Sequence, residues 1–493
     1  MGLGILDPTA VAILGYIIVA LWLFSVVLVL VLIFYERADP KSIALWMAVM
    51  LLFPAIGLFI YLCFGMSFYR QRNFALKNLS DEQMAEIVQD AVDVLDNETD
   101  SADSEEIRLL RTLTAASGSL YSVNNDIKLF TEGDKFFESL FKDLRNAKVF
   151  INAEYYIIRN DKLSNEFMDI LIEKAKAGVE VRLMVDAIGF NSGPKKRIKE
   201  LKKAGGKFKL FHRVITVLLS PKKNNRNHRK IAVIDGTIGY VSGYNIGDEY
   251  EGKGEMGFWR DSGVRVEGTG VVPMNLRFFM DWAYAYGEKI DAGSKEVLKK
   301  YFPADDCTQY GLDVMQLISG GPDTKSNPIE LQYLNMIYAA KNRLYIHTPY
   351  LVPSDNIKKA LIAAACSGTD VRIIMPDKPD HLFVFWVSIL NAGELMDHGV
   401  RIFQYKRGFV HSKSIVVDGV YSSVGSANLD QRSMTLNFET NVLIYSEKIA
   451  KQMEDVFLED LEYCEEYTLE EFRKLGRWEN FKISVARLFS SLA

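Results

Sequence analysis

The sequence predicts an α/β protein in which two similar halves follow a pair of membrane-spanning helices. Three observations support this fold class: two uncharged apolar runs near the start, an internal repeat of strands and helices, and a polar motif that occurs twice. The chain has 493 residues, of which 49% are hydrophobic and 25% charged. This composition is typical of a folded protein, and the length suggests two or three folding units.

The charge balance and the cysteine pattern argue against several classes of protein. Lys and Arg total 58 and Asp and Glu total 63, so the formal net charge is −5, which disfavours a dedicated nucleic-acid binder. The four cysteines are far apart and show no CxxC spacing. We therefore expect neither a disulfide framework nor a zinc knuckle.

The two apolar runs predict a transmembrane helical hairpin. Val11–Phe34 has 24 residues without a charge, or about 36 Å as a helix, enough to cross a hydrocarbon core of about 30 Å. A second uncharged run, Ser42–Tyr69, follows a short polar connector. The alternative is a signal peptide followed by a buried helix, which the lack of Lys or Arg at the N-terminus and of a cleavage site disfavours.

An acidic segment separates the hairpin from the body. Asp81–Glu106 contains 11 acidic residues and no basic one, which is typical of a solvated linker. The basic residues Arg70, Arg72 and Lys77, which precede it, favour the cytoplasmic side for the body. The predicted domains are the hairpin (1–70), the acidic linker (71–108), a first half (109–300) and a second half (301–493).

The body shows an internal repeat. Residues 148–186 and 343–377 each contain an apolar strand, an amphipathic helix, a Gly turn and a second apolar strand. Strands that alternate with helices imply βαβ units and a largely parallel sheet covered by helices. Because the copies are offset by about 190 residues, we expect two similar halves around a pseudo-two-fold axis.

Each half also contains one copy of a polar motif. In both copies Lys stands two positions after His, Asp stands five positions after that Lys, and Asn stands ten positions after the Asp. Asp-Gly in each copy predicts a hairpin with a type I′ turn. A two-residue turn would place His411 opposite Ser426 and His228 opposite Gly243. The motif residues are His228, Lys230, Asp235 and Asn245 in the first copy and His411, Lys413, Asp418 and Asn428 in the second.

These residue types suit chemistry on a phosphodiester. Two Lys and two Asn can hold the non-bridging oxygens, a neutral imidazole can attack phosphorus, and a protonated imidazole can protonate the leaving alkoxide. One such motif alone would more often be structural, but two copies within a repeat favour catalysis. The spacing is not HExxH, and no acidic cluster typical of Mg²⁺ sites is evident, so we expect no metal and no cofactor.

The paired motifs resemble the phospholipase D superfamily, whose mark is a duplicated HxKxxxxDx(6)GSxN. Within it the chain looks like bacterial cardiolipin synthases, a likeness that covers nearly the whole chain. The first copy departs from this pattern, because it has Ser242-Gly243 where Gly-Ser is usual. Ser426 in the second copy is therefore the only serine that matches the serine of the family motif. The further matches are the N-terminal hairpin, RNHRKIAVIDG (Arg226–Gly236), NIGDEY (Asn245–Tyr250), FWRD (Phe258–Asp261), FFMDW (Phe278–Trp282) and HTPYLVP (His347–Pro353).

The resemblance implies two phospholipase D-like halves and a reaction. Two phosphatidylglycerol molecules would give cardiolipin and glycerol through a phosphohistidine, with His228 as the nucleophile and His411 as the acid and later the base. Asp235 and Asp418 belong to the motifs, but orienting the fold or the opposite site suits them better than proton transfer. By the same resemblance, Lys230, Lys413, Asn245, Asn428 and Ser426 would bind the phosphate, and Asp261 and Glu439 would hold the His rings.

The resemblance also implies partners and a location. The expected partners are phosphatidylglycerol and anionic membrane lipid, in a bacterial cell membrane, with no nucleic acid. Basic residues within 195–209 and the apolar run Leu382–Val387 are candidate lipid contacts. The alternatives are a membrane-bound phospholipase D, a phosphatidylserine synthase-like phosphatidyltransferase and a non-catalytic membrane scaffold. A nuclease of the same chemistry is disfavoured by the hairpin and the net charge of −5. The oligomeric state stays open at this point.

Overall fold

The computed structural model describes residues 8–35, 44, 47–50, 53, 105–211, 225–288, 294–303, 310–322, 324 and 326–489. These residues fall into two units, Met1–Ala75 with Arg213–Asn225, and a body formed by Leu76–His212 with Arg226–Ala493.

The first unit contains one long helix. α1 spans Pro8–Tyr35, 28 residues without a charged side chain, and covers the first apolar run. Among the described residues, no helix meets the combined length and hydropathy of a membrane-spanning segment. Nearly all of the second predicted helix, Ser42–Tyr69, and most of the predicted linker, 71–108, lie outside the described residues.

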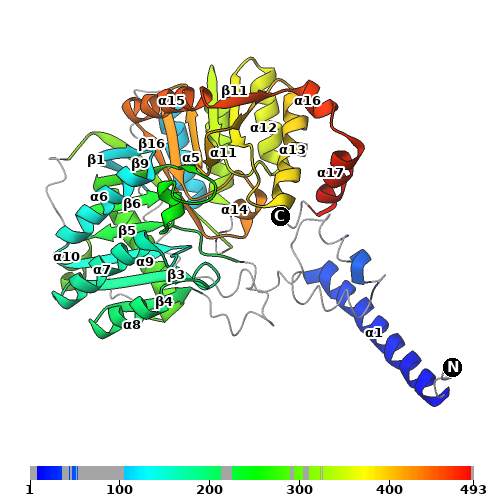
Figure 1. Ribbon diagram of the computed structural model, residues 1–493, viewed down its shortest axis with the longest axis horizontal. Coiled ribbons are helices and arrows are strands. Elements are labelled where there is room, and N and C mark those ends of the chain that lie inside the picture. Colours follow the sequence, from blue (N-terminus) through cyan, green and yellow to red (C-terminus); the bar gives the residue numbers. More distant parts are fainter. Residues whose placement is uncertain are drawn as a thin grey trace. The chain divides into compact units, whose positions relative to one another are not determined.

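The body is built on one large sheet (Figure 1). In the described part of the chain the order is β4-β3-β2-β5-β6-β8-β1-β9-β16-β15-β14-β10-β11-β12-β17, so the second half repeats the first in reverse about the β1–β9 pair. The fold is therefore α/β with two similar halves, as predicted. The first-half strands are β1 (Tyr121–Phe130), β2 (Phe150–Tyr155), β3 (Glu180–Asp186), β4 (Lys207–Phe211), β5 (Ile231–Ile234), β6 (Ile238–Ser242) and β8 (Gly263–Gly268). The second-half strands are β9 (Asp313–Gly320), β10 (Arg343–His347), β11 (Asp370–Pro376), β12 (Arg401–Tyr405), β14 (Ser414–Val417), β15 (Tyr421–Gly425), β16 (Glu439–Tyr445) and β17 (Cys464–Tyr467).

The sheet is mixed, so the prediction of a largely parallel sheet is wrong. Only β2-β3-β4 and β10-β11-β12 run parallel among the described strands of this sheet. Each half continues from its βαβ unit into the motif hairpin and one further strand, and all of these pair antiparallel. The motif hairpins that the sequence indicated therefore limit the parallel part of the sheet.

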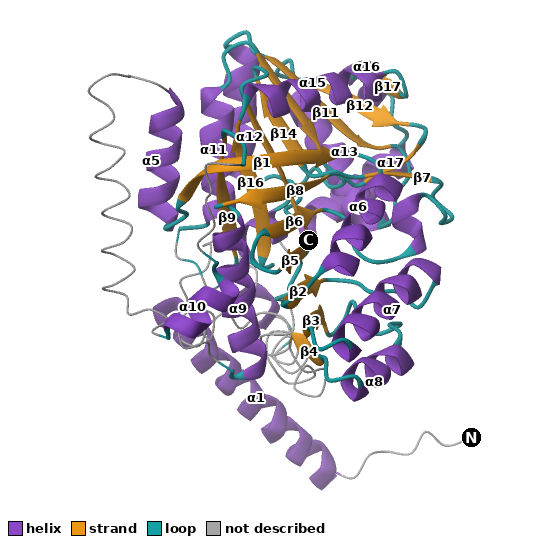
Figure 2. Ribbon diagram, turned by 90° about the vertical axis from the view of Figure 1, so that its left-hand side faces the viewer, coloured by secondary structure: helices purple, strands orange, loops and turns teal. Residues whose placement is uncertain are grey.

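Helices cover both faces of each half-sheet. In the first half, α6 (Gly133–Asn146), α7 (Lys162–Lys176) and α8 (Lys195–Lys203) pack on one face, and α9 (Val271–Tyr286) lies on the other (Figure 2). In the second half, α11 (Pro328–Ala339), α12 (Asp355–Cys366) and α13 (Leu382–Met396) share one core, and α15 (Glu447–Leu461) covers the opposite face. Alternation along the strands explains this, because odd residues of β2 such as Ile151 and Ala153 enter the α6–α8 core, whereas Asn152 hydrogen-bonds Asn275 of α9.

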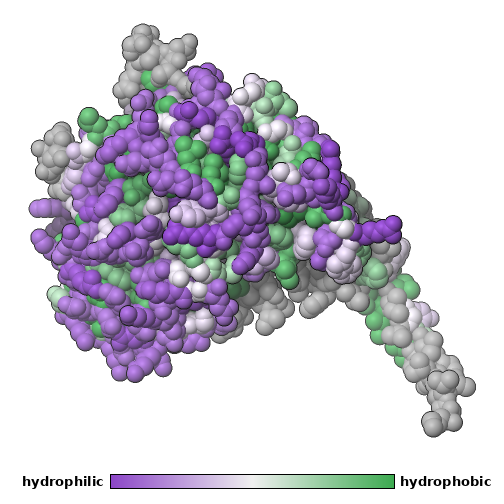
Figure 3. Space-filling view, turned by 45° about the horizontal axis from the view of Figure 1, so that its top comes forward, coloured by the Kyte–Doolittle hydropathy of each residue, from purple (hydrophilic) through white to green (hydrophobic). Residues whose placement is uncertain are grey.

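Smaller elements complete the body. α5 (Glu105–Ser117) crosses the predicted boundary between the linker and the first half, and it packs Leu109, Leu110 and Leu113 into the core of the second half. Hydrophilic side chains cover most of the body's face in Figure 3, with smaller apolar areas between them. The remaining elements are α10 (Lys295–Tyr301), α14 (Gln431–Thr435), α16 (Leu469–Arg473), α17 (Arg477–Phe489), η4 (Asp248–Glu251), β7 (Phe258–Arg260) and β13 (Gly408–Val410).

The two motif hairpins have the predicted turn but a different register. Both central residues of each turn, Asp235-Gly236 and Asp418-Gly419, have positive φ, as a type I′ turn requires. Each loop contains a third residue, Thr237 or Val420, after the Asp-Gly pair. The strand pairs next to the loops are therefore Ile234↔Ile238 and Val417↔Tyr421. Extending this register places His228 opposite Tyr244 and His411 opposite Ala427, one residue beyond the predicted Gly243 and Ser426.

Candidate active site

Backbone hydrogen bonds join the start of each motif to the opposite half. His228 N donates to Phe438 O at 2.9 Å, and His411 N donates to Arg260 O at 2.7 Å. Phe438 and Arg260 directly precede Glu439 and Asp261 in the sequence. Each motif histidine is therefore placed beside an acidic residue of the other half.

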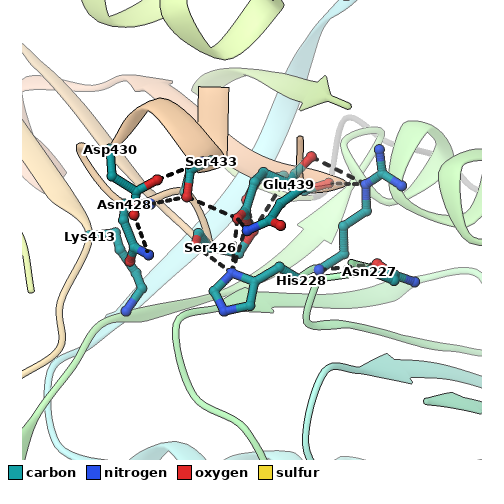
Figure 4. A network of polar contacts seen from close by, with 12 residues as sticks. Asn227, His228, Lys413, Ser426, Asn428, Asp430, Ser433 and Glu439 are labelled. Carbon is teal, nitrogen blue, oxygen red and sulfur yellow. Dashed lines mark hydrogen bonds and ion pairs between the residues drawn. The ribbon is translucent and has the colours of Figure 1, made fainter. Parts of the chain in front are cut away.

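Both histidine rings are held by these carboxylates. Nδ1 of His228 lies 3.0 Å from a carboxylate oxygen of Glu439 and 3.2 Å from Ser426 O (Figure 4). Nδ1 of His411 lies 2.6 Å from Oδ2 of Asp261. Because an ionised carboxylate only accepts, Nδ1 carries the proton in each neutral ring and Nε2 holds the free lone pair. Neither Nε2 has a hydrogen-bond partner among the described residues, so both remain available to a substrate.

The motif lysines are buried beside the histidines. Lys230 Nζ donates to His228 O at 2.6 Å, and Lys413 Nζ donates to His411 O. Burial lowers the pKa of Lys230 to about 7 and that of Lys413 to about 8, and the positive charge of Lys413 adds to the shift of Lys230. The charge of Lys413 therefore acts on Lys230, although the two cations come from different halves. A phosphate anion between them would offset the repulsion.

The two acid–histidine pairs share an electrostatic pattern. Burial lowers the pKa of both imidazoles, to about 4 in His411, where the charge of Lys413 adds to it. Burial alone would raise the pKa of Glu439 and Asp261, but interactions with the paired histidine and the nearby motif lysine outweigh it and lower both values. The carboxylates are therefore ionised and both imidazoles neutral near pH 7 before an anion binds.

The asparagines and the serine of the motifs flank these groups. Asn245 accepts from Ile157 N at 3.0 Å and donates to the Tyr250 hydroxyl at 2.7 Å. Asn428 donates to Asp430 at 3.1 Å, and its buried Oδ1 has no partner among the described residues. Ser426 Oγ donates to Glu439 at 2.5 Å. Ser426 therefore helps to orient the acid that holds His228.

The departure of the first motif copy has a steric reason. A Cβ on Gly243 would lie 2.0 Å from Oδ1 of Asp261, far closer than atoms can approach. Gly243 occupies the place of Ser426 in the second copy, because Gly243 N donates to Ser262 O as Ser426 N donates to Thr440 O. The first half thus pairs Gly with the shorter Asp, and the second half pairs Ser with Glu.

The motif aspartates lie away from this group, which corrects their inclusion among the catalytic residues. Asp235 is in the turn at the far end of its hairpin and accepts from the backbone amides of residues 148–150 at 2.8–2.9 Å. Asp418 accepts in the same way from Lys341, Asn342 and Arg343. Both carboxylates therefore fix the start of the neighbouring strand, β2 or β10, and do not reach the histidines.

Several residues near the histidines were not singled out from the sequence. The ring of Tyr156 lies 5.0 Å from that of His228, and Trp259 lies 5.2 Å from His411. Arg229 is fully buried and binds Asp281 at 2.7 Å and both Glu439 O and Thr440 Oγ1. The sequence did contain a signal for Arg229. It lies between His228 and Lys230, and because successive residues of an extended segment point to opposite sides, its side chain had to point away from theirs.

The described residues contain no group of three or more His, Cys, Asp or Glu side chains with the geometry of a metal site. The arrangement that they do contain is two imidazoles, two ammonium groups and two carboxamides, supplied in equal number by two halves of one chain.

Comparison with known proteins identifies the family. The model described as "Cardiolipin synthase, PLD-like domain" matches residues 140–262 and 333–461, one match in each half. A cardiolipin synthase of Staphylococcus aureus (strain Mu50) is 37% identical over 97% of this chain and 97% of its own length. This chain belongs to the cardiolipin synthase family.

Another family member, the cardiolipin synthase of Listeria monocytogenes serotype 4a (strain HCC23), is also 37% identical, over 97% of this chain and 99% of its own. Among solved structures, the phosphatidylserine synthase of Haemophilus influenzae Rd KW20 is similar with a TM-score of 0.58, covering 79% of this chain and 98% of that one. Because the sequence identity to this phosphatidylserine synthase is 14%, the similarity shows a shared fold and nothing about function.

Proposed function

We propose that this chain is a cardiolipin synthase that transfers a phosphatidyl group from one phosphatidylglycerol to another and releases glycerol. Family membership over nearly the full length supports the reaction. The single observation that carries the mechanism is the pair of imidazoles, His228 and His411, each held through Nδ1 by a carboxylate of the opposite half. This leaves two Nε2 atoms, one to attack and one to transfer a proton.

The first step forms a phosphohistidine. Nε2 of neutral His228 attacks phosphorus of the donor lipid, and the bond between phosphorus and the glycerol oxygen breaks. Nε2–H of protonated His411 gives its proton to that oxygen, so glycerol leaves as a neutral molecule. Lys230, Lys413, Asn245 and Asn428 hold the non-bridging oxygens as negative charge builds on them.

The second step transfers the phosphatidyl group. The terminal hydroxyl of a second phosphatidylglycerol gives its proton to Nε2 of His411 and attacks phosphorus. The bond between phosphorus and His228 Nε2 breaks, and cardiolipin is released. Both imidazoles return to their starting protonation states, so the cycle needs no other reactant.

Substrate binding itself prepares His411 as an acid. Without an anion, burial and the charge of Lys413 lower the pKa of His411 to about 4. A phosphodiester placed among the lysines adds a negative charge that raises this pKa. Binding of the donor lipid therefore favours the protonated form of His411.

We also propose a membrane anchor and lipid contacts. The lengths of the two uncharged runs of the sequence, Val11–Phe34 and Ser42–Tyr69, support a transmembrane hairpin with the body on the cytoplasmic side of a bacterial membrane. Five exposed lysines of α8 (Lys195, Lys196, Lys199, Lys202 and Lys203) lie within one stripe of that helix, which supports attraction to anionic lipid. Leu382 and Phe383 at the start of α13 are 69% and 38% exposed, which supports the second candidate lipid contact.

The domain division stays a proposal as well. The hairpin comprises 1–70, the acidic linker 71–108, the first half 109–300 and the second half 301–493. The two family-model matches, residues 140–262 and 333–461, support one phospholipase D-like unit in each half.

Product analysis tests the proposed function. The full chain is incubated in vesicles of phosphatidylcholine and phosphatidylglycerol, and lipids and glycerol are quantified by mass spectrometry. We expect cardiolipin and glycerol in equal amounts, and loss of both with His228→Ala or His411→Ala. His398→Ala, which changes an exposed histidine outside the motifs, is the control and should keep full activity. Phosphatidic acid as the main product would indicate a phospholipase D instead, and unchanged cardiolipin formation in the motif variants would refute the mechanism.

A further inference from the structure

The two halves differ in charge at one edge of the site, beside His228. Asn227 and Arg229 point to one side of the extended segment Arg226–Lys230, which precedes β5, and there they bind Glu154 and Asp281. Because alternate residues of an extended segment share a face, Arg226 points to the same side as His228 and Lys230. This face of the segment therefore carries three basic side chains, and Arg226 lies two residues before His228.

Arg226 is buried without full hydrogen bonding. The residue is only 6% exposed, its Nη1 is buried without a hydrogen-bond partner among the described residues, and the nearest carboxylate oxygen, of Asp186, is 3.9 Å away. A guanidinium has five N–H donors that require partners when buried. An incompletely satisfied arginine beside a phosphate-transfer site is therefore suited to an anionic ligand.

A second arginine, Arg432, lies at the same edge. Phe438 N donates to Arg226 O at 2.8 Å, and the preceding amide, Asn437 N, donates to Arg432 O at 3.0 Å. The two arginine backbones are thus tied to neighbouring residues of one loop. Burial lowers the pKa of Arg226, and the positive charge of Arg432 contributes to the lowering, which agrees with two side chains close enough to repel each other.

The equivalent positions of the other half carry no such cations. Phe409 stands two residues before His411, where Arg226 stands before His228, and its ring packs 4.9 Å from Trp259. Glu249 follows Asn245 by four residues, as Arg432 follows Asn428, and it binds Arg159 at 3.0 Å. The motif His, Lys and Asn are shared between the halves, whereas this pair of arginines occurs on the His228 side only.

We propose that Arg226 and Arg432 form a second phosphate-binding subsite, which holds the phosphodiester of the acceptor lipid while its hydroxyl attacks phosphorus on His228. This inference rests on the proposed function. Two residues of an extended strand span about 6.6 Å, which is comparable to the three-carbon glycerol unit that separates the acceptor's phosphate from its attacking hydroxyl. The subsite offsets repulsion between two phosphodiesters, and it selects phosphatidylglycerol over neutral alcohols as the acceptor.

The test compares two reactions that share the donor step. Cardiolipin formation needs a second lipid phosphate, whereas exchange of labelled glycerol into phosphatidylglycerol needs only the phosphohistidine and free glycerol. Both rates are measured for the full chain in the same vesicles of phosphatidylcholine and phosphatidylglycerol. We expect the ratio of cardiolipin formation to exchange to fall at least tenfold in Arg226→Gln and in Arg432→Gln, and less in Arg226→Lys, which keeps the charge.

Controls separate the possible outcomes. Arg401→Gln removes an arginine that pairs with Glu466 at 2.7 Å on strand β12, and should leave the ratio unchanged. Arg432 is only partly buried, so its variant carries the test even where Arg226→Gln does not fold. An unchanged ratio, or a parallel fall of both rates, overturns the subsite. A wild-type chain that supports neither reaction would contradict the proposed function instead.

Discussion

Nδ1 of His228 lies 3.0 Å from the carboxylate of Glu439, although 211 residues separate the two in the chain. The reciprocal pair, His411 and Asp261, is 150 residues apart and lies at 2.6 Å. Each half thus supplies one imidazole and the acid that orients the other imidazole. A single half could therefore not form a complete acid–histidine pair.

This crossed arrangement predicts the effect of removing one acid. Glu439→Gln and Asp261→Asn keep the shape of the side chain but remove the charge that fixes the tautomer and stabilises a protonated ring. We expect kcat to fall about 100-fold or more with a small change in KM, measured by cardiolipin formation. Glu466→Gln, which alters an exposed carboxylate of β17, should have no effect. Equal activity of all three variants would contradict the orienting role.

The phosphohistidine predicts a covalent adduct that depends on one histidine. Enzyme quenched with base after incubation with phosphorus-labelled phosphatidylglycerol should carry label that acid then releases. We expect this label in His411→Asn, where the intermediate forms slowly, and its complete loss in His228→Asn. Label that persists in His228→Asn and disappears in His411→Asn would reverse the two roles.

The depressed lysine pKa values predict how anion affinity depends on pH. Lys230, at about 7, and Lys413, at about 8, lose protons in the empty site as pH rises through these values, and a bound anion favours the protonated forms. Affinity for sulfate, whose charge does not change in this pH range, should therefore be highest below pH 7. Above pH 8 it should fall by up to about tenfold per pH unit for each lysine that must take up a proton. Calorimetry in buffers of different ionisation enthalpy would detect this uptake, and pH-independent binding would contradict it.

The close contact between Gly243 and Asp261 predicts that substitution by Ala lowers activity more at Gly243 than at the equivalent Ser426. Gly243→Ala places a Cβ 2.0 Å from Asp261 and should displace that carboxylate from His411, which lowers activity at least tenfold. Ser426→Ala removes the hydrogen bond that Oγ donates to Glu439 and the one that it accepts from Thr440 N, a loss of about 1–3 kcal/mol, but it creates no clash and should reduce activity less. Cardiolipin formation and thermal unfolding of both variants provide the comparison, and a smaller effect for Gly243→Ala would contradict the steric argument.

Asp235 and Asp418 should matter for stability and not for the chemical step. Replacing either by Ala leaves three backbone amides without their carboxylate acceptor. We expect a loss of about 1–3 kcal/mol in the free energy of unfolding, measured with urea, and near-normal kcat per folded molecule. A fall in kcat with unchanged stability would return these residues to the catalytic group.

The sequence predicted the α/β class, the two similar halves and the motif hairpins, because each depends on local pattern and repetition. The largely parallel sheet and the two-residue hairpin register were wrong. The register of a hairpin is fixed by its turn type and loop length, and here one extra residue, Thr237 or Val420, lies in the loop outside the ladder. The position of Tyr156 beside His228 and the ion pair of Arg229 with Asp281 depend on contacts between distant segments, which a single sequence does not reveal.

The antiparallel pair β1–β9 joins the halves within one continuous sheet. A hinge that swung the halves apart to admit two-tailed lipids would have to break this backbone ladder. Lipid entry and product release must therefore use rearrangements of loops and side chains around a rigid frame, and turnover should respond to loop substitutions more than to changes along the seam.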